Sequence, residues 1–301
     1  LAMAWSRSEP LMALIAAGSN PLWSRFSVLA PATGERLVLD SDDALAQLET
    51  ALPTDGPPSL LPGWIGYLSY ELGGLFEPTA RSRSCGNWPL ADLTWCDRAL
   101  VHDAEDDSWW SIGGCTPPEG GCLAGLMDCG PLCEGDAAAF ESAVAAAIEY
   151  IHAGDVFQAN ITRRCSGSVE GDLRSAALAA LGARGGWFGA LMEFPPHRAL
   201  LSLSPELFLA YDASTRIVRT RPMKGTRPDS CSEEELLDSP KDAAELHMIV
   251  DLVRNDLGRV CEYGSVQVND ARRIEHHPTV LQCVGEVEGR LREEASLVDL
   301  L

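Results

Sequence analysis

The first third of the chain alternates short apolar runs with turn residues, a pattern typical of β-strands. The runs occupy residues 25–31, 35–40, 63–74, 93–103 and 108–114. Residues 113–135 are rich in glycine, proline and cysteine, which predicts a surface connection. We therefore expect a strand-rich lobe at 1–112, a linker at 113–135 and a further region at 136–301.

A helix is predicted directly after this linker. Asp136 has the position of an N-cap, and Gly154 with Asp155 ends the helical pattern. Between them a single apolar stripe recurs at helical spacing, formed by Phe140, Val144, Ile148 and Ile151. Residues 156–165 are then predicted to continue as a strand.

The remaining pattern mixes strands with one long helix. Strands are predicted at 199–212, 216–224, 265–270 and 279–292. The helix is predicted over 240–258 and ends at Gly258. The residues that fall near one another on its surface are Leu237, Lys241, Glu245, Met248, Ile249 and Leu252. Because no βαβ repeat is present, the order of elements favours an α+β protein with antiparallel sheets over a doubly wound one.

Composition and charge exclude several kinds of partner. The chain has 301 residues, of which 46% are hydrophobic, and its formal net charge is −21. A field of that sign repels nucleic acid and anionic membrane surfaces. No apolar run approaches the ~20 residues of a membrane helix, and the first ten residues resemble no secretory signal. We therefore expect a cytoplasmic protein that binds neither nucleic acid nor membrane.

Four of the ten cysteines lie in the predicted linker: Cys115, Cys122, Cys129 and Cys133. A zinc site is one interpretation, but these spacings match no paired CxxC pattern and no histidine lies nearby. We interpret the segment as a flexible linker with reduced thiols.

The stretch RTRPMKGTRP, residues 219–228, concentrates four cations in this acidic chain. Arg219 and Arg221 share a face if the stretch is a strand, and Gly225 permits a close approach of backbone to ligand. A solvated basic edge strand is one interpretation. The other is a pocket for carboxylates in which neighbouring arginines favour the neutral, nucleophilic form of Lys224.

Two glutamates are further candidates. Glu206 lies within an apolar strand pattern, so it points to water, has a partner or has an altered pKa. Glu245 follows Lys241 by one helical turn, and the ordinary interpretation is a surface ion pair between the two. Neither glutamate indicates a function by itself.

Several motifs in this order resemble the chorismate-binding enzymes. They are GWIGYLSYELG, YIHAGDVFQANITRR, LSPELFL, RTRPMKGTRP, SPKDAAELHMIVDLVRNDLGRV and GSVQV. The resemblance covers most of residues 20–291. It implies large antiparallel sheets flanked by helices, and chorismate as the substrate.

Two positions distinguish branches of this family. Relatives that form isochorismate or salicylate carry a lysine base where this chain has Gln158. Anthranilate synthases usually have a small residue where this chain has Lys224, and aminodeoxychorismate synthases have lysine there. Gln158 together with Lys224 is therefore the combination expected of the aminodeoxychorismate branch, which supplies 4-aminobenzoate for folate synthesis.

The resemblance also implies the roles of individual residues. Magnesium would bind the ring carboxylate, with Glu245 as one ligand. The Lys224 amine would add at C2 of chorismate while the C4 hydroxyl leaves, with Glu206 as the proton donor, and ammonia would then add at C4. Substrate-binding residues would be Gln158, Arg221, Gly225, Thr226 and Gln282. Many relatives have histidine at the last of these positions, and glutamine there can donate a hydrogen bond but carry no charge.

Ammonia would come from a separate glutamine amidotransferase subunit, because the chain shows no glutaminase Cys-His pattern. Two alternatives remain open: anthranilate synthase component I, and a non-catalytic subunit that binds a ligand or a partner. The chain stops at SLVDLL, before a Gly-rich segment and an acidic motif of the family. We therefore expect a C-terminally incomplete chain.

Overall fold

The computed structural model covers residues 1–301 and describes all of them except 17–21, 53–60, 78–87, 120–126, 185 and 278. The chain forms two compact units. The larger combines Leu1–Gly121 with Leu178–Leu301, and the smaller is Cys122–Ala177. The helix α4 (Leu173–Arg184) contains the boundary between them.

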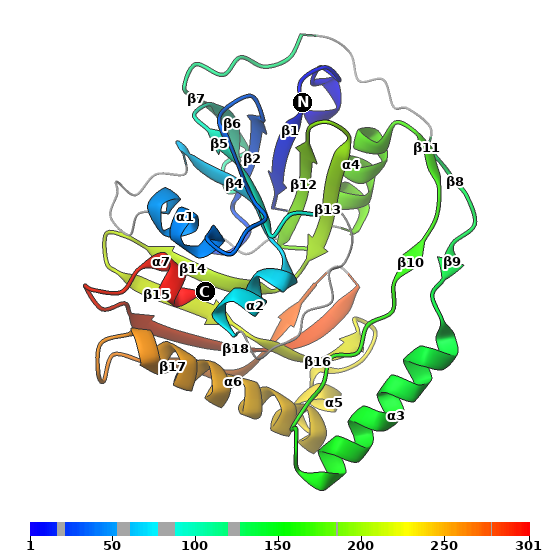
Figure 1. Ribbon diagram of the computed structural model, residues 1–301, viewed down its shortest axis with the longest axis vertical. Coiled ribbons are helices and arrows are strands. Elements are labelled where there is room, and N and C mark those ends of the chain that lie inside the picture. The colour runs from blue at the N-terminus through cyan, green and yellow to red at the C-terminus, as the bar shows by residue number, and fades with distance from the viewer. Residues whose placement is uncertain (17–21, 53–60, 78–87, 120–126, 185, 278) are drawn as a thin grey trace. The chain divides into compact units, whose positions relative to one another are not determined.

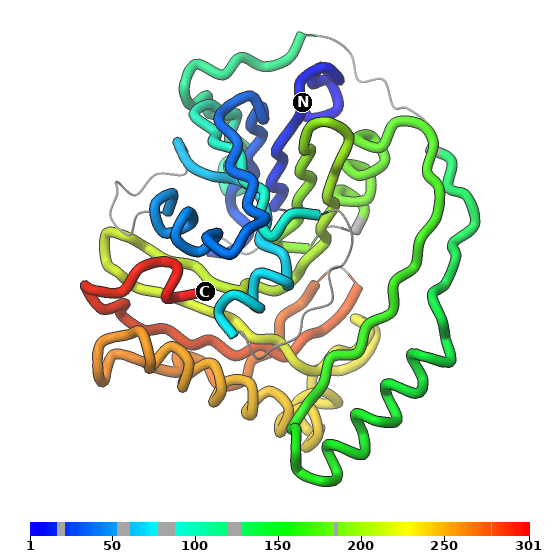
Figure 2. The backbone as a smooth tube through the Cα atoms, in the orientation of Figure 1, coloured from blue at the N-terminus to red at the C-terminus, as the bar shows by residue number. Residues whose placement is uncertain are grey.

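The larger unit contains a six-stranded antiparallel sheet in the order β13-β12-β1-β2-β6-β7. Its strands are β1 (Leu11–Ile15), β2 (Phe26–Pro31), β6 (Ala99–Asp103), β7 (Ser108–Ile112), β12 (Phe188–Phe194) and β13 (Arg198–Ser204). Figure 2 shows the green trace of β12 and β13 beside the blue trace of β1. One sheet therefore takes strands from both sides of the predicted linker, and the division into lobes stays a prediction.

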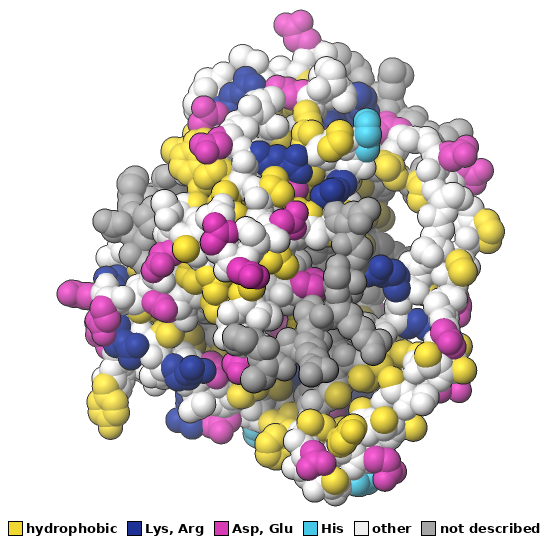
Figure 3. Space-filling model, viewed as in Figure 1, with side chains coloured by type: hydrophobic (Ala, Val, Ile, Leu, Met, Phe, Trp, Pro, Cys, Tyr) yellow, Lys and Arg dark blue, Asp and Glu magenta, His cyan; other side chains and the backbone are white. Residues whose placement is uncertain are grey.

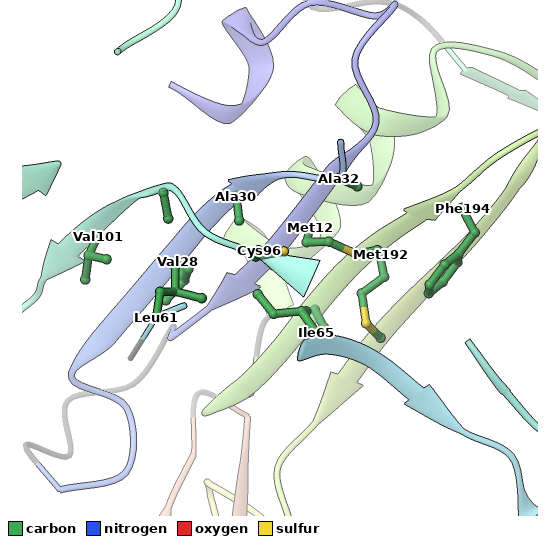
Figure 4. Packing of buried hydrophobic residues seen from close by; sticks show 12 residues of the cluster. Met12, Val28, Ala30, Ala32, Leu61, Ile65, Cys96, Val101, Met192 and Phe194 are labelled. Carbon is green, nitrogen blue, oxygen red and sulfur yellow. The ribbon is translucent and has the colours of Figure 1, made fainter. Parts of the chain in front are cut away.

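A three-stranded sheet packs its own small core in the same unit. It has the order β3-β5-β4, with β3 (Arg36–Leu39), β4 (Gly63–Leu68) and β5 (Ala91–Cys96). The helix α1 (Ala44–Ala51) buries Leu48 against Leu39 and Leu93. Between this sheet and the six-stranded one, Ile65 and Cys96 join Met12 and Met192 in a second cluster, which Figure 4 shows. The same unit contains the short helices η1 (Ala2–Ala4), η2 (Tyr70–Leu72), α2 (Gly73–Phe76) and α7 (Leu297–Leu300).

The five-stranded antiparallel sheet carries most of the predicted site. Its order is β14-β15-β18-β16, and β17 also pairs with β18. The strands are β14 (Leu207–Asp212), β15 (Ile217–Arg221), β16 (Met223–Pro228), β17 (Gln267–His276) and β18 (Val280–Arg290). The helices α5 (Glu233–Leu237) and α6 (Pro240–Val260) lie along one face of it, as Figure 1 shows for α6.

Packing on that face explains which side of α6 is buried. Leu246 and Val250 of the helix join Leu281, Cys283 and Val287 of β18 in one cluster. Alternate residues of a strand face opposite sides of its sheet. The odd-numbered positions of β18 therefore face the helix, and the even-numbered ones face the other side.

The smaller unit consists of the helix α3 and two short ribbons. Its elements are β8 (Met127–Cys129), β9 (Cys133–Glu134), α3 (Ala137–Ala153), β10 (Cys165–Ser166) and β11 (Val169–Gly171). The pairs β9 with β10 and β8 with β11 are antiparallel. Asp136 caps α3 by accepting a hydrogen bond from the Ala139 amide, and Gly154 ends the helix with a left-handed φ of 82°. Both predicted ends of this helix are confirmed.

Two predictions about elements are wrong. The strand expected over 156–165 is absent, because only Cys165 of that range is paired in a strand. The helix α6 continues past Gly258 to Val260, because Val260 still packs against the core cluster, and a single glycine costs a helix only about 1 kcal/mol.

Within the described ranges, no helix combines the length and the apolar character that crossing a bilayer requires.

Candidate active site

Lys224 follows the turn between β15 and β16. The two residues before it, Pro222 and Met223, are each fixed by a hydrogen bond. Pro222 interrupts the strand, and its carbonyl oxygen accepts a hydrogen bond of 2.9 Å from the Gly285 amide. The Met223 amide donates to Oε1 of Glu206 at 3.0 Å. The structure therefore brings the carboxylate of Glu206, itself exposed, to the residue adjacent to Lys224.

Pairing between β16 and β18 is irregular at Lys224. Met223 pairs with Val284 and Thr226 with Gln282, and the register shifts in between. Three residues of β16 therefore span the length of two on β18, which is the count of a β-bulge. Such bulges redirect side chains near functional sites.

Each arginine of the 219–228 stretch has a carboxylate partner inside the protein. The pairs are Arg219 with Glu288 at 2.8 Å, Arg221 with Glu275, and Arg227 with Asp242 at 2.7 Å. Within the part of the chain that the structure describes, Lys224 is partly buried and forms no ion pair. The stretch is therefore no free basic patch, and Figure 3 shows basic side chains interspersed with acidic ones on the visible face.

Arg221 is the most enclosed of these arginines, with a side chain only 1% exposed. Its guanidinium carbon lies 5.0 Å from the ring centre of Trp23 and 5.3 Å from that of Trp187. Burial lowers the pKa of Arg221 from its usual value, and the negative charge of Glu275 opposes this effect. A substrate carboxylate would have to compete with two protein glutamates for this guanidinium, because Glu286 is also 3.6 Å from its Nε.

Gly225 brings the bulge against the first turn of α6. Its φ is +85°, and a Cβ built there would lie 2.9 Å from the Cβ of Asp242. Asp242 is buried, and a hydrogen bond with Ser239, together with Arg227, lowers its pKa. This tight contact fixes the end of α6 that carries Glu245 next to the bulge.

Glu245 follows Asp242 by one turn and is partly exposed. Its Oε1 lies 3.6 Å from Nζ of Lys241, an ion pair between side chains that are 39% and 81% exposed. Exposed pairs of this kind contribute little to stability. The surface ion pair expected between Lys241 and Glu245 is thus present in the structure, and a role of Glu245 as a metal ligand stays a prediction.

A row of polar side chains crosses three strands beside the bulge. Glu275 of β17 pairs with Gln282 of β18, which pairs with Thr226 of β16. Residues directly opposite each other in a sheet share a face, so these three side chains lie on the face away from α6. Thr226 is exposed, whereas Oε1 of Gln282 is buried and has no hydrogen-bond partner among the described residues.

His277 lies at the end of this row. Its ring packs against that of Trp187, tilted by 42° with centres 4.7 Å apart, and its Nε2 is 4.0 Å from Oε2 of Glu275. Burial lowers the pKa of His277 from its usual value, which favours the neutral ring. The sequence pointed to Gln282 but gave no sign of the contacts of Glu275 and His277, because these depend on strand register.

Asp242 is a third residue that sequence reasoning missed. Its signal was present, because Ser239 and Asp242 have the spacing of an N-cap and the third helical residue. The Asp242 amide donates to the Ser239 hydroxyl at 3.3 Å. What the pattern could not show is that the same aspartate touches Gly225 and binds Arg227.

Gln158 belongs to the smaller unit and is exposed, in the segment between α3 and β10. Its role at the Lys224 site stays a prediction.

The described residues do not make a complete magnesium site. Glu245 could supply one carboxylate oxygen, the kind of ligand that Mg²⁺ prefers. In the described parts of the chain, no group of three or more His, Cys, Asp or Glu side chains could hold a metal ion. The same holds for the predicted linker cysteines that are described, of which Cys115 is buried while Cys129 and Cys133 are exposed, and Cys122 lies outside the described residues.

The protein has an α+β fold with antiparallel sheets, and its site is a lysine-bearing bulge within the five-stranded sheet. Residues 132–301, more than half of the chain, match the family model described as chorismate binding enzyme. The chain therefore belongs to the chorismate binding enzyme family, as its motifs indicated.

Individual relatives point to two branches of that family. The chain is 40% identical over 187 residues to anthranilate synthase component 1 1 of Haloarcula marismortui, covering 57% of this chain and 38% of that protein. It is 33% identical over 289 residues to aminodeoxychorismate synthase of Streptomyces griseus, covering 85% and 39%. The chain thus spans well under half the length of these relatives.

The fold has a close counterpart among solved structures. The crystal structure of anthranilate synthase component I from Streptococcus pneumoniae TIGR4 matches with a TM-score of 0.80 at 23% identity, covering 95% of this chain and 73% of that one. This likeness confirms the α+β fold with large antiparallel sheets.

Proposed function

We propose that the protein carrying this chain aminates chorismate at C4 to give 4-amino-4-deoxychorismate. The observation that carries this proposal is Lys224 in its bulge, partly buried and without an ion pair among the described residues, next to Met223, whose amide binds the carboxylate of Glu206. An amine that is not engaged in an ion pair is available to act as a nucleophile.

The rarity of lysine in this chain supports a specific role for the amine of Lys224. The chain has 23 lysines and arginines, and only Lys224 and Lys241 are lysines. Lys241 is an exposed helix residue, whereas Lys224 lies within a sheet. Arginine cannot replace lysine as a nucleophile, because it stays protonated.

The proposed reaction balances without an oxidant or a reductant. The Lys224 amine adds at C2, the double bond shifts, and the C4 hydroxyl leaves as water with a proton from Glu206. The proton that the amine loses on bonding to C2 returns to Glu206. Ammonia then adds at C4 and expels the amine from C2, and one proton of ammonia passes to the departing amine, which regenerates the lysine. The net change is replacement of the C4 hydroxyl by an amino group, with loss of one water.

Ammonia is proposed to come from a partner subunit. Several relatives are named component 1, for example the aminodeoxychorismate synthase component 1 of Escherichia coli, which implies a second component in those enzymes. We propose a glutamine amidotransferase as the partner here. Magnesium stays a proposal with Glu245 as one ligand, and no step is assigned to it.

The proposal is tested with purified protein, chorismate, magnesium and ammonium. The expected product is 4-amino-4-deoxychorismate, identified by chromatography and mass, and Lys224→Ala should abolish it. Lys241→Ala is the matched control and should retain activity. Full activity of the Lys224→Ala variant would remove the covalent step from the mechanism.

Anthranilate synthase is the second candidate, in which ammonia enters at C2. The relative from Haloarcula marismortui and the structure from Streptococcus pneumoniae favour it. Fluorescent anthranilate as the main product of the same assay would establish this candidate and refute the role assigned to Lys224.

A further inference from the structure

The charges around Arg221 form a closed ring across three strands, in which Arg221 and Glu275 are buried while Glu286 and Arg273 are partly exposed. Oε1 of Glu275 accepts from Arg221 and also from Nη2 of Arg273 at 2.8 Å. Oε2 of Glu286 lies 3.6 Å from Nε of Arg221 and 3.5 Å from Nη2 of Arg273. Two arginines and two glutamates thus share their charges, and we call these four residues the charge ring.

Stability alone does not explain why charged side chains, and not apolar ones, occupy the positions of the charge ring. Burying ions is unfavourable, and apolar side chains of similar volume often stabilise a protein as well or better. Within the described structure, Nε of Arg221 and Oε2 of Glu275 are buried without a hydrogen-bond partner, so the ring does not even satisfy its own polar atoms. In some proteins buried ionic groups are retained because they enforce a single geometry, and that is the role considered for this ring.

The ring lies where it can set the position of Lys224. Arg221 ends β15, three residues before Lys224, and the register irregularity of β16 means that regular ladder pairing does not fix the lysine. The lysine is instead placed by its neighbours: the Arg221 side chain, the Pro222 carbonyl and the Met223 amide. Glu275 is also the strand partner of Gln282 in the polar row.

We infer that Glu275 is a positioning residue for the reaction at Lys224: it holds Arg221, and through Arg221 the turn that aims the amine. This inference rests on the proposed function and adds to it a residue that does not touch the substrate. Arg221 then acts by holding the backbone. Glu275→Gln keeps the shape of the side chain but removes one of the two carboxylate charges shared by the arginines, the one that accepts hydrogen bonds from both.

The chain supplies a matched control for this variant. Arg219 and Glu288 are register partners on the same two strands, β15 and β18, two residues farther from Lys224. Their side chains are 41% and 24% exposed, so the pair is not enclosed. Glu288→Gln therefore removes an ion pair next to the ring without touching the ring.

The first measurement compares turnover and stability. Glu275→Gln should lower kcat for chorismate amination on the order of 10- to 100-fold with KM changed less than about twofold, since small displacements of a reacting group have effects of this size. Glu288→Gln should change kcat less than about twofold. The double variant Arg221→Met with Glu275→Gln should regain thermal stability but not kcat. If activity returned together with stability, the ring would be only structural and the inference wrong.

The second measurement needs no chorismate. Trace acetylation followed by mass spectrometry gives the labelling rate of Lys224 relative to Lys241, the other lysine of the chain. The ratio should rise at least about threefold in Glu275→Gln, because a partly buried amine loses its fixed place, and stay unchanged in Glu288→Gln. An unchanged ratio in Glu275→Gln would overturn the inference. If the wild-type protein made no aminodeoxychorismate, yet the labelling ratio still rose in Glu275→Gln, the proposed function would be refuted instead.

Discussion

Replacing Gly225 by alanine should destabilise the protein and displace the lysine-bearing bulge. The residue has a φ of +85°, and the new Cβ would lie 2.9 Å from Cβ of Asp242 and 3.0 Å from Cδ1 of Leu236. The left-handed backbone costs an alanine roughly 1–2 kcal/mol. Overpacking against a buried helix adds about 1–3 kcal/mol, so the free energy of unfolding should fall by roughly 2–5 kcal/mol.

Gly264 provides the control that separates these two contributions. Its φ is +80°, but nothing lies within 4 Å of a Cβ built there. Gly264→Ala should therefore show only the backbone contribution of roughly 1–2 kcal/mol. Urea denaturation followed by circular dichroism measures both variants. Equal losses at Gly225 and Gly264 would show that the contact with α6 is not tight, and would refute the reasoning that places this helix at the site.

Three further predictions follow from single contacts. Asp242→Asn should lower the free energy of unfolding at neutral pH, and its difference from wild type should shrink as the pH falls below ~4. The reason is that a carboxyl with a lowered pKa stabilises the folded protein only above its titration range. Urea denaturation midpoints between about pH 3 and 7 test this. Glu206→Gln should keep the contact with the Met223 amide but lose proton donation, lowering kcat about 10²- to 10⁴-fold with little change in melting temperature. A thiol reagent should modify the exposed cysteines of the native protein rapidly and the buried ones only after denaturation, since burial raises the pKa of Cys96 and Cys261 to about 11. The two groups are Cys129, Cys133 and Cys165, and Cys96, Cys115, Cys261 and Cys283.

Local signals explain which elements the sequence predicted correctly. Asp136 and Gly154 mark the ends of α3 because capping depends on residues within one turn of the helix end. Most strands of the first 112 residues were visible as apolar runs between turns for the same reason. The antiparallel sheets and the α+β class followed from the order of these elements.

The features that the sequence did not predict depend on tertiary contacts. The buried side of α6 is defined by Leu246 and Val250 against β18, and not by a stripe that the helix shows in isolation. The segment 156–165 has the composition of a strand but lacks a pairing partner over most of its length. No pattern along the chain announces that Glu275 would meet Arg221, because they lie on strands that are not adjacent in sequence.

The candidate site was predicted in part. Lys224, Glu206 and Gly225 were named from the sequence, and the structure brings the Glu206 carboxylate and the first turn of α6 to the bulge. The sequence suggested that the arginines of residues 219–228 form a basic pocket or an exposed basic strand, whereas the structure pairs each of them with a carboxylate, which a basic stretch seen in sequence does not show. The ion pairs of Arg219, Arg221 and Arg227 become visible only once the sheet is assembled.

The most direct test of the account is whether chorismate becomes bound to Lys224. Protein incubated with chorismate and magnesium, without ammonia, is digested, and the masses of the peptides containing Lys224 and Lys241 are measured. The account predicts an adduct of chorismate less one water on the Lys224 peptide alone, lost when ammonium is added. An unmodified Lys224 peptide from protein that still forms aminodeoxychorismate would contradict it.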